Sequence, residues 1–366
     1  MDKKQRTVIF CFLTGGLWIM SMIVFGCAPA QPPVPTPTPS PTPVPARPVE
    51  IENVSQVVQL AELSGHTGAV YSITWSPDGA YLASSSSDGT IRIWDSKTGQ
   101  SLRTLDSKLD SVWGVAWSPT DDMLASSISD GTVVIWNPTT GEQIATLPSE
   151  PTGYDMVYCI AWSPDGKLLA IGHNNGAVII YEPLSGKKVQ SWSGHLGGMS
   201  TEVIAIAWSP VGKQLASGGL DFNVRLWDPS TGASGAVLKA DTTRRNDING
   251  LAWSPDGRFL AAASQDGHAR IWDPAAEKVV GDLNAGNDWK RGVAWSPNGQ
   301  LLAVTGEYRI VQIWDPVNAK ELIKLTGHQA PVWSASWSPD GSFLATGSGI
   351  YEKAGGDTSI RIWGLP

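Results

Sequence analysis

One block of residues repeats seven times along the chain, and this repeat constrains the fold more than any other feature. Each block opens with Trp-Ser-Pro and closes with an aromatic residue, nineteen residues later in the first six blocks and twenty-six residues later in the last. The opening residues are Trp75, Trp117, Trp162, Trp208, Trp253, Trp295 and Trp337. The closing residues are Trp94, Trp136, Tyr181, Trp227, Trp272, Trp314 and Trp363. Repeats of this length bury their cores against their neighbours, so the sequence predicts one repeat domain.

Hydrophobic residues alternate with a period of two inside each block, which predicts strands. In the first block we expect strands at Val70–Trp75, Tyr81–Ser85, Thr90–Trp94 and Gln100–Leu105. Between the first two, Ser76–Gly79 reads Ser-Pro-Asp-Gly, in which Pro favours the first turn position and Gly tolerates positive φ. Each block therefore predicts a small antiparallel sheet.

The repeat resembles the WD-repeat β-propeller family, in which each repeat forms one four-stranded blade. This resemblance implies an all-β fold, a seven-bladed propeller over residues 49–366. The last block ends soon after Trp363, whereas Val57–Leu63 occupies the repeat position of an outer strand. We expect this N-terminal strand to complete blade seven and to close the ring, which removes an exposed sheet edge.

Three blades carry a set of His, hydroxyl, Asp and Trp residues. In the family these positions resemble a structural tetrad, a buried hydrogen-bond chain, and their recurrence at one register favours this role over catalysis by Ser, His and Asp. The tetrads are His66, Ser84, Asp88 and Trp94; His195, Ser217, Asp221 and Trp227; and His328, Thr346, Asp357 and Trp363.

The remaining blades keep less of the set. Blade two has Lys108 in place of the His, blade five retains Asp266 and Trp272, and blades three and six have Asn175 and Tyr308 in place of the Asp. We expect these blades to be less rigid than the three with full tetrads.

Residues 1–26 predict a secretory signal, with basic residues followed by an uncharged run from Val8 to Phe25. The segment Val-Phe-Gly-Cys resembles a bacterial lipoprotein processing box, which implies acylation of Cys27. An uncleaved membrane helix is the alternative, since the run approaches the ~20 residues that span a bilayer. Either reading predicts a location in the bacterial envelope, outside the cytoplasmic membrane, with membrane contact by the anchor alone.

Residues 27–48 are rich in Pro and Thr and predict an extended stalk. Its Thr-Pro alternation leaves O-glycosylation open. Beyond the signal and Cys27, the chain has one cysteine, Cys159, which we interpret as a small core residue.

The net charge of −8 argues against nucleic acid as a partner. No metal-ligand spacing and no phosphate-binding glycine loop is present, so the sequence predicts no metal, no cofactor, no catalytic residue and no enzyme activity. We expect a monomeric propeller.

Loop lengths vary on one rim of the predicted ring, the top face by family convention, and this is where binding is usually placed. Four residues before each opening Trp is a position that in the family points to this rim near the channel. It holds Tyr71, Trp113, Tyr158, Ile204, Asn249, Arg291 and Trp333. Tyr, Trp and Arg are enriched at interface hot spots. The predicted partner-binding residues are Tyr71, Trp113, Tyr158, Trp289, Arg291 and Trp333.

Packing of these rings against neighbouring blades is the alternative to a binding surface. A basic cluster of Arg244, Arg245, Lys290 and Arg291 is predicted nearby. The sequence thus favours a scaffold that binds a protein or peptide partner on the top face. Glycan binding and an enzyme or cofactor-binding propeller remain as alternatives.

Overall fold

The structure is a computed structural model that describes residues 46–108, 111–147, 156–195, 201–239, 246–351 and 356–366. Residues 46–366 form one compact unit, which begins slightly before the predicted boundary at residue 49. Cys27 and the predicted signal and most of the stalk lie outside the described residues. No helix in the described part of the chain is long and apolar enough to cross a bilayer.

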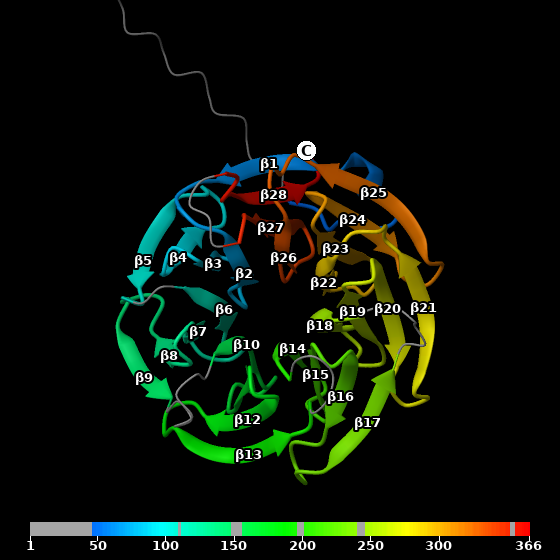
Figure 1. Ribbon diagram of the computed structural model, residues 1–366. Helices are drawn as coiled ribbons and strands as arrows, with labels where there is room; N and C mark the ends of the chain where they lie inside the picture. Colours follow the sequence, from blue (N-terminus) through cyan, green and yellow to red (C-terminus); the bar gives the residue numbers. More distant parts are fainter. Residues whose placement is uncertain (1–45, 109–110, 148–155, 196–200, 240–245, 352–355) are drawn as a thin grey trace, which may run out of the picture. The chain divides into compact units, whose positions relative to one another are not determined.

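Seven four-stranded antiparallel sheets surround a central channel (Figure 1), which confirms the predicted seven-bladed propeller. Blade one contains β2 (Val70–Trp75), β3 (Tyr81–Ser86), β4 (Thr90–Asp95) and β5 (Ser101–Asp106). Blade two contains β6 (Val112–Trp117), β7 (Leu124–Ile128), β8 (Val133–Trp136) and β9 (Gln143–Leu147). Blade three contains β10 (Val157–Trp162), β11 (Leu169–His173), β12 (Ala177–Glu182) and β13 (Lys187–Ser193). Blade four contains β14 (Val203–Trp208), β15 (Leu215–Gly219), β16 (Asn223–Trp227) and β17 (Ser234–Lys239).

The other three blades have the same order from the channel outward. Blade five contains β18 (Ile248–Trp253), β19 (Leu260–Ser264), β20 (His268–Asp273) and β21 (Lys278–Asn284). Blade six contains β22 (Lys290–Trp295), β23 (Leu302–Gly306), β24 (Ile310–Asp315) and β25 (Lys320–Thr326). Blade seven contains β26 (Val332–Trp337), β27 (Phe343–Ser348), β28 (Ile360–Gly364) and, outermost, β1 (Val58–Leu63).

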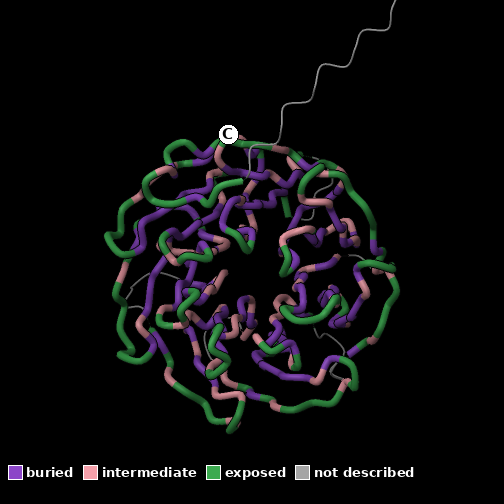
Figure 2. Tube along the Cα trace, turned by 180° about the vertical axis from the view of Figure 1, so that it is seen from behind, coloured by how far each residue is buried: buried purple, intermediate pink, exposed green. Residues whose placement is uncertain are grey.

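The N-terminal strand closes the ring, as predicted. β1 pairs with β28 in antiparallel register from Val58 opposite Gly364 to Leu63 opposite Ile360. The 3-10 helix η1 (Val54–Gln56) precedes it. Figure 2 shows that the outer strands carry most of the exposed residues, whereas the residues of the inner strands are mostly buried or half-buried.

The Ser-Pro-Asp-Gly turn is held by its own side chains. Ser76 Oγ donates to Asp78 Oδ1 at 2.6 Å and accepts from the Tyr81 N–H at 2.9 Å, while Gly79 has a φ of 70°. That left-handed conformation favours glycine. The turn therefore sets the length of the connection between the inner strand and its neighbour.

In six blades the opening Trp joins the blade to the preceding one by a hydrogen bond. Trp75 Nε1 donates to the carbonyl of Ser336 at 2.9 Å, and Trp162 Nε1 donates to the carbonyl of Ala116 at 3.0 Å. The same bond recurs at Trp208, Trp253, Trp295 and Trp337. Apolar clusters that span adjacent blades complete the core, so the repeat needs both neighbours to be stable.

Candidate functional site

A β-bulge near the start of every inner strand aims one side chain at the channel. In β2 the register with β3 shifts between Val70 and Ser72, so Tyr71 is left out of the ladder. A bulged residue is unpaired and its side chain is redirected, and bulges are common beside functional sites. The same shift occurs in all seven blades and selects Tyr71, Trp113, Tyr158, Ile204, Asn249, Arg291 and Trp333.

Four of these seven bulge residues form a continuous aromatic arc over blades seven, one, two and three. Tyr71 and Trp113 are stacked, with ring centroids 4.4 Å apart and an interplanar angle of 11°. Trp333 meets Tyr71 edge to face at 5.1 Å, and Tyr158 meets Trp113 edge to face at 5.1 Å. Stacked and edge-to-face pairs of this kind are favourable and geometrically specific. We call Trp333, Tyr71, Trp113 and Tyr158 the aromatic arc.

Tyr351, from the long loop of blade seven, lies on this arc. Its ring centroid is 5.8 Å from Trp113, 6.1 Å from Trp333 and 6.3 Å from Tyr71. Tyr351 is 47% exposed, whereas Tyr71 is only 7% exposed. Tyr71 is therefore buried among the other rings, and the accessible aromatic surface consists of Tyr351 and the half-buried Trp113, Tyr158 and Trp333.

Arg291 extends the arc into blade six. Its guanidinium carbon lies 4.2 Å from the centroid of Trp333 and 5.4 Å from that of Trp289. Arg291 Nε also donates to Glu307 Oε1 at 2.8 Å. The guanidinium is thus fixed by two rings and a carboxylate, and Trp289 remains 48% exposed beside it.

Blades four and five give the channel mouth a different character. Ile204 contributes an aliphatic side chain, and Asn249 Nδ2 donates to the carbonyl of Lys290 at 2.7 Å. Burial, with the nearby Glu202 carboxylate, raises the pKa of Tyr158 to about 12, so its hydroxyl stays protonated. Burial and the charge of Asp247 raise the pKa of Glu202. The mouth therefore has an aromatic side and an aliphatic and acidic side.

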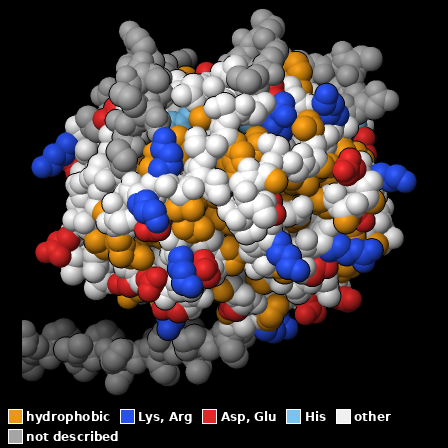
Figure 3. All heavy atoms as spheres, turned by 90° about the horizontal axis from the view of Figure 1, so that it is seen from below, with side chains coloured by type: hydrophobic (Ala, Val, Ile, Leu, Met, Phe, Trp, Pro, Cys, Tyr) orange, Lys and Arg blue, Asp and Glu red, His pale blue; other side chains and the backbone are white. Residues whose placement is uncertain are grey.

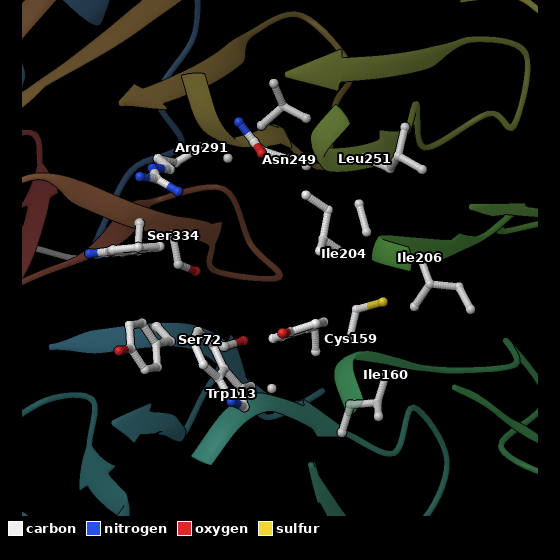
Figure 4. Close-up of a pocket in the computed structure, with 18 of the residues that line it drawn as sticks. Ser72, Trp113, Cys159, Ile160, Ile204, Ile206, Asn249, Leu251, Arg291 and Ser334 are labelled. Carbon is white, nitrogen blue, oxygen red and sulfur yellow. The ribbon is translucent and has the colours of Figure 1, made fainter. Parts of the chain in front are cut away.

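At the mouth the channel holds a cavity of about 220 Å³. Figure 4 shows the side chains of Arg291, Asn249, Ile204 and Trp113 arranged around it. The next residue of each inner strand is small, and one of these residues is Cys159. Burial raises the pKa of the Cys159 thiol, which keeps it protonated. Cys159 thus lines the channel as an unreactive small residue.

The structure joins the residues of each predicted tetrad in one hydrogen-bond chain. In blade four, His195 Nδ1 lies 2.8 Å from Asp221 Oδ1, and His195 Nε2 lies 2.7 Å from Ser217 Oγ. Trp227 Nε1 donates to the same Ser217 Oγ at 2.8 Å. The chain recurs in blades one and seven, through His66, Ser84, Asp88 and Trp94 and through His328, Thr346, Asp357 and Trp363.

The hydroxyl in these chains is inaccessible to a substrate. Ser84 and Ser217 are 0% exposed, and each hydroxyl is engaged by both an imidazole and an indole. Burial alone would raise the pKa of Asp221, but the hydrogen bonds and charges of His195, Asn223 and Arg225 together outweigh it, and the pKa falls to about 2. The carboxylate is therefore ionised within a buried network, which suits a structural role rather than nucleophilic chemistry.

Blade six has a different buried network, which the sequence analysis missed. Val304 occupies the hydroxyl position, and Trp314 Nε1 has no hydrogen-bond partner among the described residues. Lys290 Nζ instead forms a buried ion pair with Asp288, whose second oxygen accepts the N–H of Tyr308 at 3.1 Å. Tyr308 stands at the position of the tetrad Asp and has no carboxylate. Asp288 supplies a buried carboxylate in its place. The only sequence signal was Asp-x-Lys at the start of β22.

The prediction that Lys290 belongs to a basic cluster near the binding surface is wrong. This side chain is buried and paired with Asp288, because it replaces part of the tetrad, and Arg291 is paired with Glu307. Arg244 and Arg245 lie outside the described residues. Within the described ranges, no group of three His, Cys, Asp or Glu residues is placed to hold a metal ion.

Comparisons with known proteins agree with this architecture. Residues 71–202 match the family model described as the first beta-propeller of WDR19. Four segments match the WD domain, G-beta repeat, at residues 186–228, 236–273, 278–315 and 319–364.

Similar proteins share about one repeat with this chain. Protein Mut11 of Chlamydomonas reinhardtii is 52% identical over 42 residues, which cover 12% of this chain and 11% of that protein. The small ribosomal subunit protein RACK1 of Candida albicans is 44% identical over 50 residues, covering 14% and 16%. Eukaryotic translation initiation factor 3 subunit I of Neurospora crassa is 46% identical over 48 residues, covering 13% and 14%. The chain spans less than a fifth of each relative, and it is a seven-bladed β-propeller that contains WD40 repeats.

Proposed function

We propose that this chain is a protein-interaction scaffold, held outside the cytoplasmic membrane of a bacterium by a lipid on Cys27, that binds a protein or peptide at the channel mouth. The observation that carries the binding site is the set of seven bulges, which aim one side chain per blade at a single opening. The scaffold accepts Ile204 and Asn249 at this position, so packing does not require an aromatic residue there.

The chemistry of the mouth favours a peptide chain. Trp113, Trp333 and Tyr351 present accessible ring area, and Arg291 adds a fixed cation, a combination typical of interface hot spots. Because Tyr71 and Trp113 cover one face of each other, few open ring faces remain for stacking on a sugar. A peptide that contacts ring edges and pairs with polar groups fits this surface better than a glycan.

Two further observations support a protein partner. On the side of the ring seen in Figure 3, basic and acidic side chains are interspersed, with hydrophobic side chains between them, so no single-sign patch for nucleic acid is visible there. Two similar proteins have names that place them in assemblies, namely a small ribosomal subunit protein and an initiation factor subunit. We therefore propose that the partner of this chain is also a protein, and the test below is designed to identify it.

Capture from the native envelope tests the binding site. The full chain is compared with a variant that carries Trp113→Ala, Tyr158→Ala and Trp333→Ala, after both are shown to melt alike. We expect a protein that the wild type retains and the variant loses. A matched Ile204→Ala and Asn249→Ala variant, changed at the same bulge position, should retain it. Retention by the triple aromatic variant would contradict the proposed site.

A Cys27→Ser variant tests the proposed anchor separately. We expect the wild-type chain to incorporate radiolabelled fatty acid and to sediment with membranes, and the variant to lose the label. A variant that remains labelled at the wild-type level would contradict lipidation at Cys27.

A further inference from the structure

The N-terminal segment of the chain fills a groove between blades six and seven, on the rim that carries the Trp-Ser-Pro turns. Val49, Val54 and Val57 are buried there, and the Val49 N–H donates to the carbonyl of Gly341 at 3.0 Å. They pack in one apolar cluster with Leu301, Ile313, Leu322, Trp337 and Leu365. A short segment that contains the 3-10 helix η1 and presents three valine side chains thus occupies this groove.

An equivalent groove lies between blades five and six, one blade earlier in the chain. A cavity of about 480 Å³ lies there. The residues that correspond to the five cluster positions above, counted from the opening or closing Trp of each repeat, are Phe259, Ile271, Val280, Trp295 and Pro316. None of the described residues fills it as Val49 and Val54 fill its neighbour, and we call it the five-six groove.

Exposure of the lining distinguishes the empty groove from the filled one. Val280 is 54% exposed, and Val317, on the opposite side of the groove, is 87% exposed. Between blades six and seven, Leu322 at the position of Val280 is half-buried. Phe259 and Trp295 of the five-six groove are also half-buried, whereas the matching Leu301 and Trp337 are 0% and 8% exposed. Exposed apolar side chains that face one another across a groove mark an interaction site rather than scattered surface residues.

A third groove at the same register holds a smaller cavity, of about 340 Å³, and is bridged by a side chain. Between blades one and two, Arg103 crosses the groove and donates from Nη1 to the carbonyl of Thr140 at 3.1 Å. Gly281 stands at the position of Arg103 in blade five, so no side chain bridges the five-six groove there. The lining also contains Pro255, Pro316 and Trp295, which leave an apolar surface open to the side chains of a partner.

We propose that the five-six groove is a second docking site, which binds a short segment of a partner protein that presents valine side chains as residues 49–57 do. The groove repeats the interface that residues 49–57 already make with blades six and seven. A lining carboxylate, Asp256, and Arg258, which lies 4.9 Å over the ring of Phe259, allow the partner to be fixed by charge at the rim. This site is on the opposite rim from the mouth and does not rest on the function proposed above.

A fluorescent peptide with the sequence of residues 46–57, Ala-Arg-Pro-Val-Glu-Ile-Glu-Asn-Val-Ser-Gln-Val, is the probe. Fluorescence anisotropy measures its binding to the full chain and to a Val280→Asp, Val317→Asp variant, whose substituted side chains are exposed and should leave folding intact. The matched control is Ile144→Asp, Leu184→Asp, which changes the same repeat positions between blades two and three. Thermal melting checks that all three chains fold alike.

We expect saturable binding that is at least about tenfold weaker in the Val280, Val317 variant and unchanged in the control. The Trp113, Tyr158, Trp333 variant should bind the peptide normally. Absence of binding to the wild type, or equal binding by the groove variant and the control, would overturn the proposal. Concentration-dependent dimerisation that the groove variant abolishes would overturn it too, because a second copy would then be the occupant.

Discussion

Blades one and six face the same channel but hold their cores together differently. In blade one the buried network consists of His66, Ser84, Asp88 and Trp94, none of which lies on the inner strand β2 that carries Tyr71. In blade six the buried pair is Asp288 and Lys290, and Trp289 and Arg291 alternate with them at the start of β22.

This difference teaches how stability and binding are coupled. A change in the tetrad of blade one lowers stability without displacing the mouth residue, because the two sets lie on separate strands. A change in the buried pair of blade six moves Trp289 and Arg291 as well, because neighbouring residues of one strand point to opposite sides. Blade six should therefore be the blade in which structural mutations also alter partner binding.

Removal of residues 51–63 is expected to have the largest effect, because it takes the outer strand from blade seven. The deletion exposes the edge of β28 and loses the burial of Val54 and Leu63, each worth about 1.5–3 kcal/mol. Urea unfolding should show a loss of several kcal/mol, whereas deletion of residues 28–45 should change little. Equal midpoints for the two deletions would contradict closure by β1.

Lys290→Met should be the most damaging single substitution in blade six. It leaves Asp288 buried without its cation, which typically costs about 3–5 kcal/mol. An added Asp288→Leu should recover most of the lost stability but not the position of Trp289, so partner binding should stay weak. A cost below roughly 1 kcal/mol in urea unfolding, which is the value of an exposed ion pair, would show that the pair is not part of the core.

Ser84→Ala tests the tetrad of blade one. His66 Nε2 and Trp94 Nε1 both lose their partner, which should cost about 1–3 kcal/mol in unfolding free energy. Partner binding at the mouth should remain at the wild-type level. A variant that keeps its stability, or that loses binding, would break the contrast between blades one and six.

Val304→Thr is the reverse experiment in blade six. A hydroxyl at this position would meet the unpaired Trp314 Nε1 and should stabilise the protein by about 1 kcal/mol. Differential scanning calorimetry would measure the shift. A lower melting temperature would mean that the hydroxyl is not within reach of the indole.

The pH dependence of stability should be the smallest effect. Burial lowers the pKa of His66 and His328 below the ordinary value of 6.5, despite their bonds to Asp88 and Asp357. The unfolded chain therefore binds protons first as the pH falls, and stability should decrease below pH 6.5. Asp221, with a pKa of about 2, loses its contribution only as the pH falls below 3.8. A His66→Gln variant should show a shallower decrease below pH 6.5; an unchanged slope would contradict this origin.

The sequence was sufficient for the features that repeat and insufficient for those that occur once. The Trp-Ser-Pro spacing predicted the blades, the closure by β1 and the register of the bulge residues. It did not predict that Tyr351 covers Tyr71, because their contact depends on a loop found in blade seven alone.

The sequence also did not indicate the buried ion pair of blade six or the groove filled by the N-terminal segment. Lys290 looks like a surface cation, and only its distance to Asp288 in the folded chain shows that it is buried and paired. Val49 and Val54 lie outside the repeat, so periodicity gave no indication that they complete the apolar cluster between blades six and seven. Such contacts depend on residues far apart in the chain.

The most direct test of the central claim is the affinity of the captured partner for two matched variants at the bulge positions. One carries Trp113→Ala and Tyr158→Ala, the other Ile204→Ala and Asn249→Ala, and calorimetric titration measures both against the wild type. If the aromatic arc is the binding surface, the first variant should lose about 1,000-fold in affinity, since two hot-spot side chains at about 2 kcal/mol each sum to roughly 4 kcal/mol, and the second should lose little. Equal losses, or a larger loss in the second variant, would contradict the proposed function.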